Sequence, residues 1–196
     1  MDLPSILVIS IIICGFMYVA IGLLYSAIKK SGAKRWLECL ASVLLIVGAV
    51  GFFGSGLSAI GGLNWLPGSF EWPVGNASGV ITVSNFFVVP HTPSGRVQVY
   101  GRDWKFVRGW HVDAGGGTFK LKMPDQYHIA VITARGQWHY VFDLNGKLLS
   151  KEKYSPASYS AFQGEGQSYV VPTPPWLWVF SSPFYSWLLI ALGIGL

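Results

Sequence analysis

The stretch NFFVVPHTPSGRVQVYGRDWKFV, residues 85–107, matches the pattern of YHIAVITARGQWHYVFDLNGKLL, residues 127–149, when the two are aligned without gaps. Apolar residues of the two copies fall into register at Phe87/Ile129, Val89/Val131, Val99/Val141, Tyr100/Phe142, Phe106/Leu148 and Val107/Leu149. Three of the 23 aligned positions are identical, so the repeat rests on its pattern. Short apolar runs that recur with a period of roughly 40 residues predict sheet-like repeat units.

Turn signals separate the apolar runs within each copy. Asn145 and Gly146 lie between two such runs and supply the positive φ that a tight hairpin turn requires. Residues 135–137 make the preceding turn, and residues 92–95 and 102–104 occupy the same two places in the first copy. We therefore expect each copy to form four antiparallel strands.

The strand pattern continues on both sides of the aligned stretch. Residues 118–122 alternate apolar and basic side chains, which is typical of a half-buried strand. The repeats are thus expected near residues 76–111 and 118–153. A partial third copy is expected from Ala161, with residues 169–171 as its last strand.

The second copy resembles a known repeat. Residues 117–119 (GTF), Pro124, residues 129–131 (IAV) and residues 140–149 (YVFDLNGKLL) are similar to the blade repeat of NHL-type six-bladed β-propellers. The first copy departs from this pattern, because Trp104 replaces a glycine and Pro90 interrupts the second strand. The resemblance implies propeller-like sheets that serve as a binding scaffold, and it brings no catalytic motif.

Two blades cannot close a ring, and an unclosed sheet exposes strand edges with unpaired backbone groups. Three arrangements would cover them. Several subunits could associate until the ring closes, the blades could lie against a larger neighbour, or the two sheets could fold on each other. The first two require a partner.

The composition predicts a membrane protein, since 52% of the residues are hydrophobic, 12% are charged and the mean hydropathy is +0.45. Residues 3–28 and 40–62 carry no charge, and each run exceeds the roughly 20 residues that a membrane-spanning helix needs. We expect spans at 3–28 and 37–62, joined by a loop at 29–36. The alternative of a cleaved signal peptide lacks the positive N-terminal region of such peptides.

A third uncharged run, residues 176–196, ends the sequence as a third transmembrane or interfacial helix. If this helix starts at the N-cap signal Ser182-Pro183, it is too short for a full span, and residues 176–181 lie along the interface. The expected fold class is thus three transmembrane helices, with 1–63 as a helical hairpin and 64–175 as an all-β extracytoplasmic domain of blade-like antiparallel sheets.

The loop between the first two helices sets the topology. Its positive residues are Lys29, Lys30, Lys34 and Arg35, and short basic loops stay on the cytoplasmic side. The N-terminus and the β domain are then expected outside the cytoplasm, with the bacterial inner (cytoplasmic) membrane as the location. Tryptophans that favour the headgroup level flank the β domain as interfacial anchors, namely Trp65, Trp72, Trp176 and Trp178.

Small residues recur four apart along the second helix and predict a face for docking another helix. They form two neighbouring rows, Gly51, Ser55, Ala59 and Gly54, Ser58, Gly62. The partner is either the first helix of the same chain, which offers Gly22 and Ser26, or a helix of another subunit.

The residues that could carry chemistry do not form a recognisable site. Cys14 and Cys39 differ too much in depth to form a disulfide. His128 and His139 lie on strands expected to be neighbours, and His111 with Asp113 is a second candidate ligand pair, but both lack the further ligands of a metal site. We expect no catalytic residues, no metal and no cofactor, although a bound lipid fits the composition. A net charge of +3 over residues 64–175 is too small to favour nucleic acid.

These observations favour a non-catalytic accessory subunit of a larger integral-membrane complex. Other membrane subunits or further copies of the chain are its expected partners, besides the bilayer. The alternative is an extracytoplasmic ligand-binding or sensor module that is anchored in the membrane.

Overall fold

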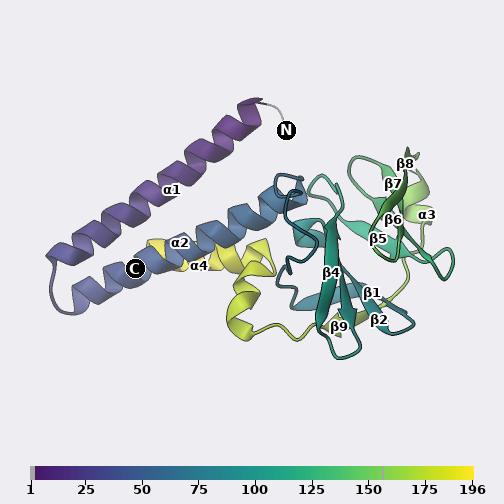
Figure 1. Cartoon of the computed structure of the whole chain (residues 1–196). Coiled ribbons are helices and arrows are strands. Elements are labelled where there is room, and N and C mark those ends of the chain that lie inside the picture. Colours follow the sequence, from purple (N-terminus) through teal and green to yellow (C-terminus); the bar gives the residue numbers. More distant parts are fainter. Residues whose placement is uncertain (1–2, 156) are drawn as a thin grey trace. The chain divides into compact units, whose positions relative to one another are not determined.

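A computed structural model describes residues 3–155 and 157–196, with side chains from residue 11 onward except residue 13. The chain forms two compact units (Figure 1). The helical unit contains the chain up to Ser55 together with Ser182–Leu196, and the β unit is Gly56–Ser181.

The helical unit is built from α1 (Leu3–Lys29), most of α2 (Ala33–Ala59) and α4 (Pro183–Gly195). Among the described side chains, one helix is long and apolar enough to cross a membrane, and this is α2 with 27 residues. The described apolar part of α1, Cys14–Lys29, is shorter, and so is α4. The expectation of three transmembrane helices is therefore reduced to one candidate, whose bounds are 33–59 and not 37–62.

The last helix begins at Pro183 and not at Trp176. Ser182 is its N-cap, and the Ser182 hydroxyl accepts a hydrogen bond from the Phe184 backbone N–H at 3.3 Å. The preceding residues form a separate 3-10 helix, η2 (Pro175–Phe180). A 13-residue α-helix is about 20 Å long, which is less than the hydrocarbon core of a bilayer.

Close contacts hold the helical unit together. Ala20, Leu45 and Ile190 form a buried cluster, which brings α1, α2 and α4 together. A Cβ at Gly48 would lie 2.7 Å from the Ser186 carbonyl oxygen and 2.8 Å from Ile190. Gly48 therefore permits α4 to pack directly on the backbone of α2.

The β unit contains two antiparallel sheets. The first has the strand order β4-β3-β2-β1-β9, and the second has the order β5-β6-β7-β8. The strands of the first are β1 (Asn76–Val83), β2 (Phe86–His91), β3 (Arg96–Gly101), β4 (Phe106–His111) and β9 (Gln167–Val170). Those of the second are β5 (Phe119–Lys122), β6 (His128–Thr133), β7 (Trp138–Asp143) and β8 (Leu148–Lys153).

The two sheets share one plan. Strands β6, β7 and β8 begin at the residues that the alignment of the two copies places on the first residues of β2, β3 and β4. The third pairing shifts register between Val99 and Tyr100 in the first sheet and between the equivalent Val141 and Phe142 in the second. The repeat in the apolar pattern is therefore also a repeat of strands, pairing and irregularities.

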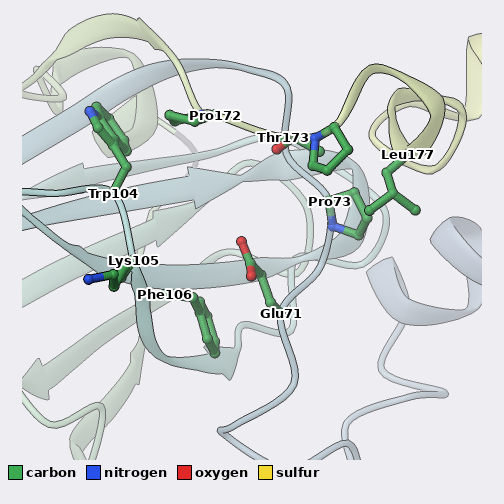
Figure 2. Close-up of a pocket in the computed structure, with 9 residues that line it drawn as sticks. Glu71, Pro73, Trp104, Lys105, Phe106, Pro172, Thr173 and Leu177 are labelled. Atoms are coloured by element: carbon green, nitrogen blue, oxygen red, sulfur yellow. The ribbon is translucent and has the colours of Figure 1, made fainter.

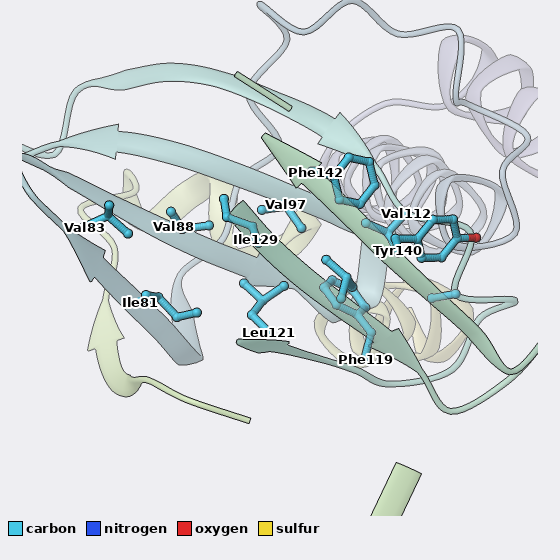
Figure 3. Close-up of a cluster of buried hydrophobic side chains, with 12 residues drawn as sticks. Ile81, Val83, Val88, Val97, Val112, Phe119, Leu121, Ile129, Tyr140 and Phe142 are labelled. Carbon is cyan, nitrogen blue, oxygen red and sulfur yellow. The ribbon is translucent and has the colours of Figure 1, made fainter. Parts of the chain in front are cut away.

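The two sheets pack face to back. Val88 and Val97 of the first sheet lie in one core with Ile129 and Phe142 of the second, as Figure 3 shows. Val131 of the second sheet belongs to the same core. The first-sheet equivalents of these three second-sheet residues, Phe87, Val89 and Tyr100, belong to another cluster on the opposite face of their own sheet. The second sheet thus turns toward its neighbour the face that the first sheet turns away. Adjacent members of a stacked repeat meet in this way.

Segments outside the repeats cover the two end faces of this stack. Val74, Val171 and the partly buried Tyr169 pack on the outer face of the first sheet. On the outer face of the second, the Lys120 amine donates hydrogen bonds of 3.0 Å to the carbonyl oxygens of Tyr159 and Phe162, which lie on and just beyond α3 (Ala157–Ala161). The chain therefore buries both end faces of the stack at least partly by itself.

The third copy that the sequence predicted is reduced to one strand. The segment after Ala161 contributes β9, which pairs antiparallel with β1 and extends the first sheet. A Cβ at Gly166, where φ is +114°, would lie 2.5 Å from the Gly79 carbonyl carbon, so the two segments approach more closely than other residues allow. The segment after Ala161 thus pairs with β1 and does not form the independent sheet that the sequence predicts.

Candidate functional site

A groove of about 530 Å³ opens on the outer face of the first sheet (Figure 2). Its walls combine aromatic rings, prolines and two charged side chains, namely Glu71, Pro73, Trp104, Lys105, Phe106, Pro172, Thr173, Pro174 and Leu177. The segment before β1, the turn between β3 and β4, and the segment after β9 each contribute one wall. Grooves of this size commonly hold small molecules or single side chains.

A chain of buried hydrogen bonds positions the carboxylate of the groove. Gln98 is fully buried and held at both ends of its amide, because Oε1 accepts from the Trp72 N–H at 2.6 Å and Nε2 donates to the Trp72 carbonyl at 2.8 Å. Nε2 also donates to the Tyr100 hydroxyl at 3.0 Å, and this hydroxyl donates to Glu71 Oε1 at 3.0 Å. Burial and the Glu71 charge raise the pKa of Tyr100, so the hydroxyl stays protonated as a donor.

Glu71 forms no ion pair with any of the described residues. The basic residue of the groove lining, Lys105, pairs instead with Asp103 at 2.8 Å. Figure 2 shows the Lys105 amine directed away from Glu71. The groove therefore contains an exposed carboxylate that a buried donor holds in place and no basic side chain of the described chain neutralises.

Trp104 forms the aromatic wall in an unusual backbone conformation. Its φ is +59°, and the equivalent residue of the second copy, Gly146, has a φ of +82°. A bulky residue in the left-handed region costs about 1–2 kcal/mol. The Trp104 ring stacks on Phe87 with a centroid distance of 4.3 Å and an interplanar angle of 6°. The glycine missing from the first copy is thus replaced by a strained tryptophan at the edge of the groove.

A second polar cluster lies where α2 enters the β unit. The Ser58 hydroxyl donates to the Ser94 carbonyl at 2.7 Å. The His91 ring contacts the Ser94 hydroxyl through Nδ1 at 2.6 Å and the Ser181 carbonyl through Nε2 at 2.8 Å. Because a carbonyl only accepts, Nε2 carries the proton and Nδ1 accepts from Ser94. Burial, with the Arg96 charge, lowers the pKa of His91 to about 4, so the ring is neutral at pH 7.

Arg96 and His111 leave polar atoms unsatisfied beside this cluster. Arg96 is 1% exposed, and its Nη2 donates to the Phe70 carbonyl at 3.1 Å. Within residues 3–155 and 157–196, Arg96 Nε and both His111 ring nitrogens are buried without a hydrogen-bond partner. Burial lowers the pKa of His111. The Asp113 charge partly offsets this effect, and the Arg96 charge adds a smaller lowering.

The four predicted anchor tryptophans separate into two kinds. Trp65 is 71% exposed and Trp176 is 73% exposed, which leaves both free to reach a headgroup layer. Trp72 is buried, and its indole N–H donates to the Phe180 carbonyl at 2.9 Å. Trp178 is partly buried and donates to the Thr173 carbonyl at 3.1 Å. Trp72 is therefore a core residue of the β unit.

The predicted docking face of α2 is mostly occupied inside the chain. Gly51, Ser55, Ser58 and Ala59 are buried, whereas Gly54 is half-buried and Gly62 is exposed. Ser58 bonds to Ser94, as described above, and the Ala59 carbonyl accepts from the Gly116 N–H at 3.2 Å. A Cβ added at Gly15 or Gly22 of α1 would meet nothing within 4 Å. Open small-residue positions thus lie on α1, and Gly56 is one on α2 outside the predicted rows.

The four basic residues of the predicted loop are exposed, but the turn between α1 and α2 is shorter than residues 29–36. Lys29 ends α1, while Lys34 and Arg35 lie in the first turn of α2. Lys30 forms an ion pair with Glu38 of α2. The basic cluster is therefore built on two helix ends.

The predicted pair of His128 and His139 is not brought together. Although β6 and β7 are neighbours, His128 pairs in register with Asp143 and His139 pairs with Ile132, so the two histidines lie at opposite ends of the strands. His128 Nδ1 lies 2.6 Å from Asp125 Oδ2. Among the described residues, no group of three His, Cys, Asp or Glu side chains could hold a metal ion.

Comparison with known proteins supplies no relative. No protein-family model, no curated protein and no solved structure matches this chain.

The repeat pattern does not identify Glu71, which lines the groove, or Gln98, which positions Glu71 through Tyr100. Glu71 precedes the aligned stretch, and Gln98 stands where the second copy has Tyr140. Trp104 departs from the pattern of the repeat, and this departure is the signal that the sequence offers. Of the two departures from the repeat pattern, Trp104 lines the groove and Pro90 does not.

Proposed function

We propose that this protein is a membrane-anchored, non-catalytic accessory subunit of a larger integral-membrane complex. The observation that carries the proposal is the face of α1 that contains Gly15 and Gly22. These glycines are seven residues apart and therefore lie on the same side of the helix, two turns from each other. Both leave open space where a Cβ would stand, which permits close approach of a helix from another protein.

Large apolar side chains on the same helix support this proposal. Tyr18, Ile21 and Ile28 are 81%, 57% and 68% exposed. Such surfaces are stable only against lipid or against another membrane protein. The proposal places the β unit on the extracytoplasmic side, because the basic helix ends around Lys30 and Lys34 favour the cytoplasm.

Gentle detergent extraction tests the proposal. The wild-type protein is expected in a large particle, whose other members mass spectrometry identifies. Gly22→Leu is expected to release it, because the leucine side chain fills the space that the partner helix needs. Val50→Leu is the matched control, since Val50 is an exposed residue of α2 and the change adds one methylene. Recovery of the wild type as a lone monomer contradicts the proposal.

The groove at Glu71 favours a second function, that of a membrane-anchored ligand-binding module. An exposed carboxylate fixed by a buried tyrosine, next to an aromatic wall, is an arrangement suited to recognition. This second function does not require a partner protein. The two proposals therefore predict different behaviour after extraction.

A further inference from the structure

We propose that the groove between Glu71 and Trp104 binds the ammonium group of a small organic cation, either a soluble ammonium compound or the ammonium group of a phospholipid headgroup. This inference rests on the second proposed function, the ligand-binding module, and is independent of the accessory-subunit proposal. Three properties of the groove determine the ligand class: its charge, its walls and its preorganisation.

The Glu71 carboxylate of the groove forms no ion pair within the described residues. Glu71 has no basic partner among the described residues, whereas the amine of Lys105 is occupied by Asp103. An anionic ligand would have to approach the Glu71 carboxylate, which is unfavourable. A cation gains an ion pair that the protein itself does not form.

The walls of the groove suit an organic cation better than a metal ion. Trp104 and Phe106 present rings, and Pro73, Pro172 and Pro174 present apolar surfaces. Calcium or magnesium would require six or more oxygen ligands. An ammonium group with carbon substituents instead gains attraction from aromatic faces and from contact with the apolar walls.

The carboxylate is held ready before any ligand arrives. The Tyr100 hydroxyl fixes Glu71, and Gln98 fixes that hydroxyl through its two bonds to the Trp72 backbone. A ligand therefore does not have to order the carboxylate, which reduces the entropic penalty of binding. The retained strain at Trp104 agrees with a positioned wall, because strained residues persist where a functional surface needs them.

The same surroundings are compatible with a lipid as the carrier of the ammonium group. Trp176 directly precedes Leu177, a residue of the groove, and is 73% exposed. Exposed tryptophan favours the headgroup layer of a membrane. The ammonium group of a zwitterionic headgroup and a soluble ammonium compound offer the same chemistry, so the experiment must separate them.

The test titrates the full-length protein in maltoside micelles with choline chloride, followed by isothermal calorimetry. The neutral isostere 3,3-dimethyl-1-butanol has the same shape without the charge and serves as the ligand control. We expect choline to bind at least about tenfold more tightly, which corresponds to about 1.4 kcal/mol. Equal binding of the two compounds would overturn the inference.

Matched variants locate the site. Glu71→Gln is expected to weaken choline binding about tenfold or more, and Tyr100→Phe about threefold, through loss of the carboxylate charge and of its orientation. Asp113→Asn is the control, because extending the alignment of the two copies places Asp113 at the position equivalent to Glu71. Circular dichroism verifies that each variant is folded. Unchanged binding by folded Glu71→Gln contradicts the assignment.

Nanodiscs separate the two sources of the ammonium group. If phosphatidylcholine nanodiscs suppress choline binding and phosphatidylglycerol nanodiscs do not, a lipid headgroup occupies the groove. If choline binds equally in both, the ligand is a soluble ammonium compound. Both outcomes support the ammonium site. If the ammonium-site proposal failed, the accessory-subunit proposal would remain intact, because that proposal is judged by co-purification with partner proteins.

Discussion

The repeat β1–β4 and the repeat β5–β8 have the same strands, the same order and the same register shift, yet their equivalent residues meet different surroundings. Tyr100 lies on an outer face near the groove, whereas Phe142 lies in the core between the sheets. Tyr100 carries a hydroxyl and Phe142 does not, which follows from this difference in surroundings. Strand pairing is thus common to the copies, and position in the stack determines which copy carries polar chemistry.

The surroundings also differ at the turn that precedes the last strand of each copy, and this explains why the two turns have different residues. Trp104 and Gly146 both donate their backbone N–H to the residue three positions earlier, Gly101 or Asp143, at 3.0 Å. Gly146 faces the ring of Trp110, so that copy has no room for a side chain. Trp104 stands at the edge of the groove, where a ring fits. One backbone conformation therefore serves two different surroundings.

The largest expected effect comes from Gly146→Ala. The new Cβ would lie 2.4 Å from Cε3 of Trp110, at a φ of +82°. Overpacking and backbone strain together are expected to lower the free energy of unfolding by about 3 kcal/mol. Chemical denaturation measures the loss.

Asn145→Ala is the control, because this exposed side chain is not needed for the turn's backbone hydrogen bonds, and a change below about 0.5 kcal/mol is expected. Equal stability of Gly146→Ala and the wild type would show that the turn has space after all.

The next prediction concerns how the free energy of unfolding depends on pH through His91. The equivalent residue of the second copy is Thr133, which does not titrate. The pKa of His91 is lowered to about 4 in the folded protein, against about 6.5 when the chain is unfolded. Between these values the unfolded state binds more protons, so this contribution is complete above pH 6.5 and is lost as the pH falls toward 4. The loss amounts to about 3 kcal/mol, which urea denaturation as a function of pH measures. His91→Thr should flatten this dependence. A wild-type slope that survives in the variant would assign it to other groups.

A smaller effect is expected when Tyr100 receives the residue of the second copy. Tyr100→Phe removes the hydroxyl that links Gln98 to Glu71, while Gln98 Nε2 retains the Trp72 carbonyl as acceptor. The free energy of unfolding should fall by about 1 kcal/mol. Thermal denaturation measures the change. A loss above about 3 kcal/mol would contradict this prediction, because the variant keeps the aromatic ring and removes only the hydroxyl and its two hydrogen bonds.

The smallest effect is expected from Asp103→Asn, which introduces the residue that Asn145 provides in the second copy. The change removes an exposed ion pair with Lys105. Such pairs contribute little, so the free energy of unfolding, measured by chemical denaturation, should change by less than about 0.5 kcal/mol. Loss of the pair also frees the Lys105 amine, which can then compete with choline for Glu71. Weaker choline binding by this variant would sharpen the assignment of Glu71 as the cation site.

Local chemistry was readable where a signal lies within a few neighbouring residues. The Asn145-Gly146 turn, the strands of the second copy and the cap at Ser182 all follow from short-range patterns, and the structure contains each of them. The α2 docking rows were less informative, because small residues pack equally well against the same chain or another protein. Ser58 and Ala59 belong to the β unit and bond within it, to Ser94 and Gly116.

The sequence by itself determined the apolar helices, the strand repeat and the turns, because hydrophobic periodicity and backbone preference act over a few residues. Only the tertiary structure decided that the sheets stack face to back, that β9 joins β1, and that Glu71 meets Tyr100. Those contacts join residues distant in sequence, such as Glu71 and Tyr100, 29 positions apart, and Asn76 and Val170 on strands from opposite ends of the unit. Packing of whole sheets sets such contacts, and no local pattern encodes it.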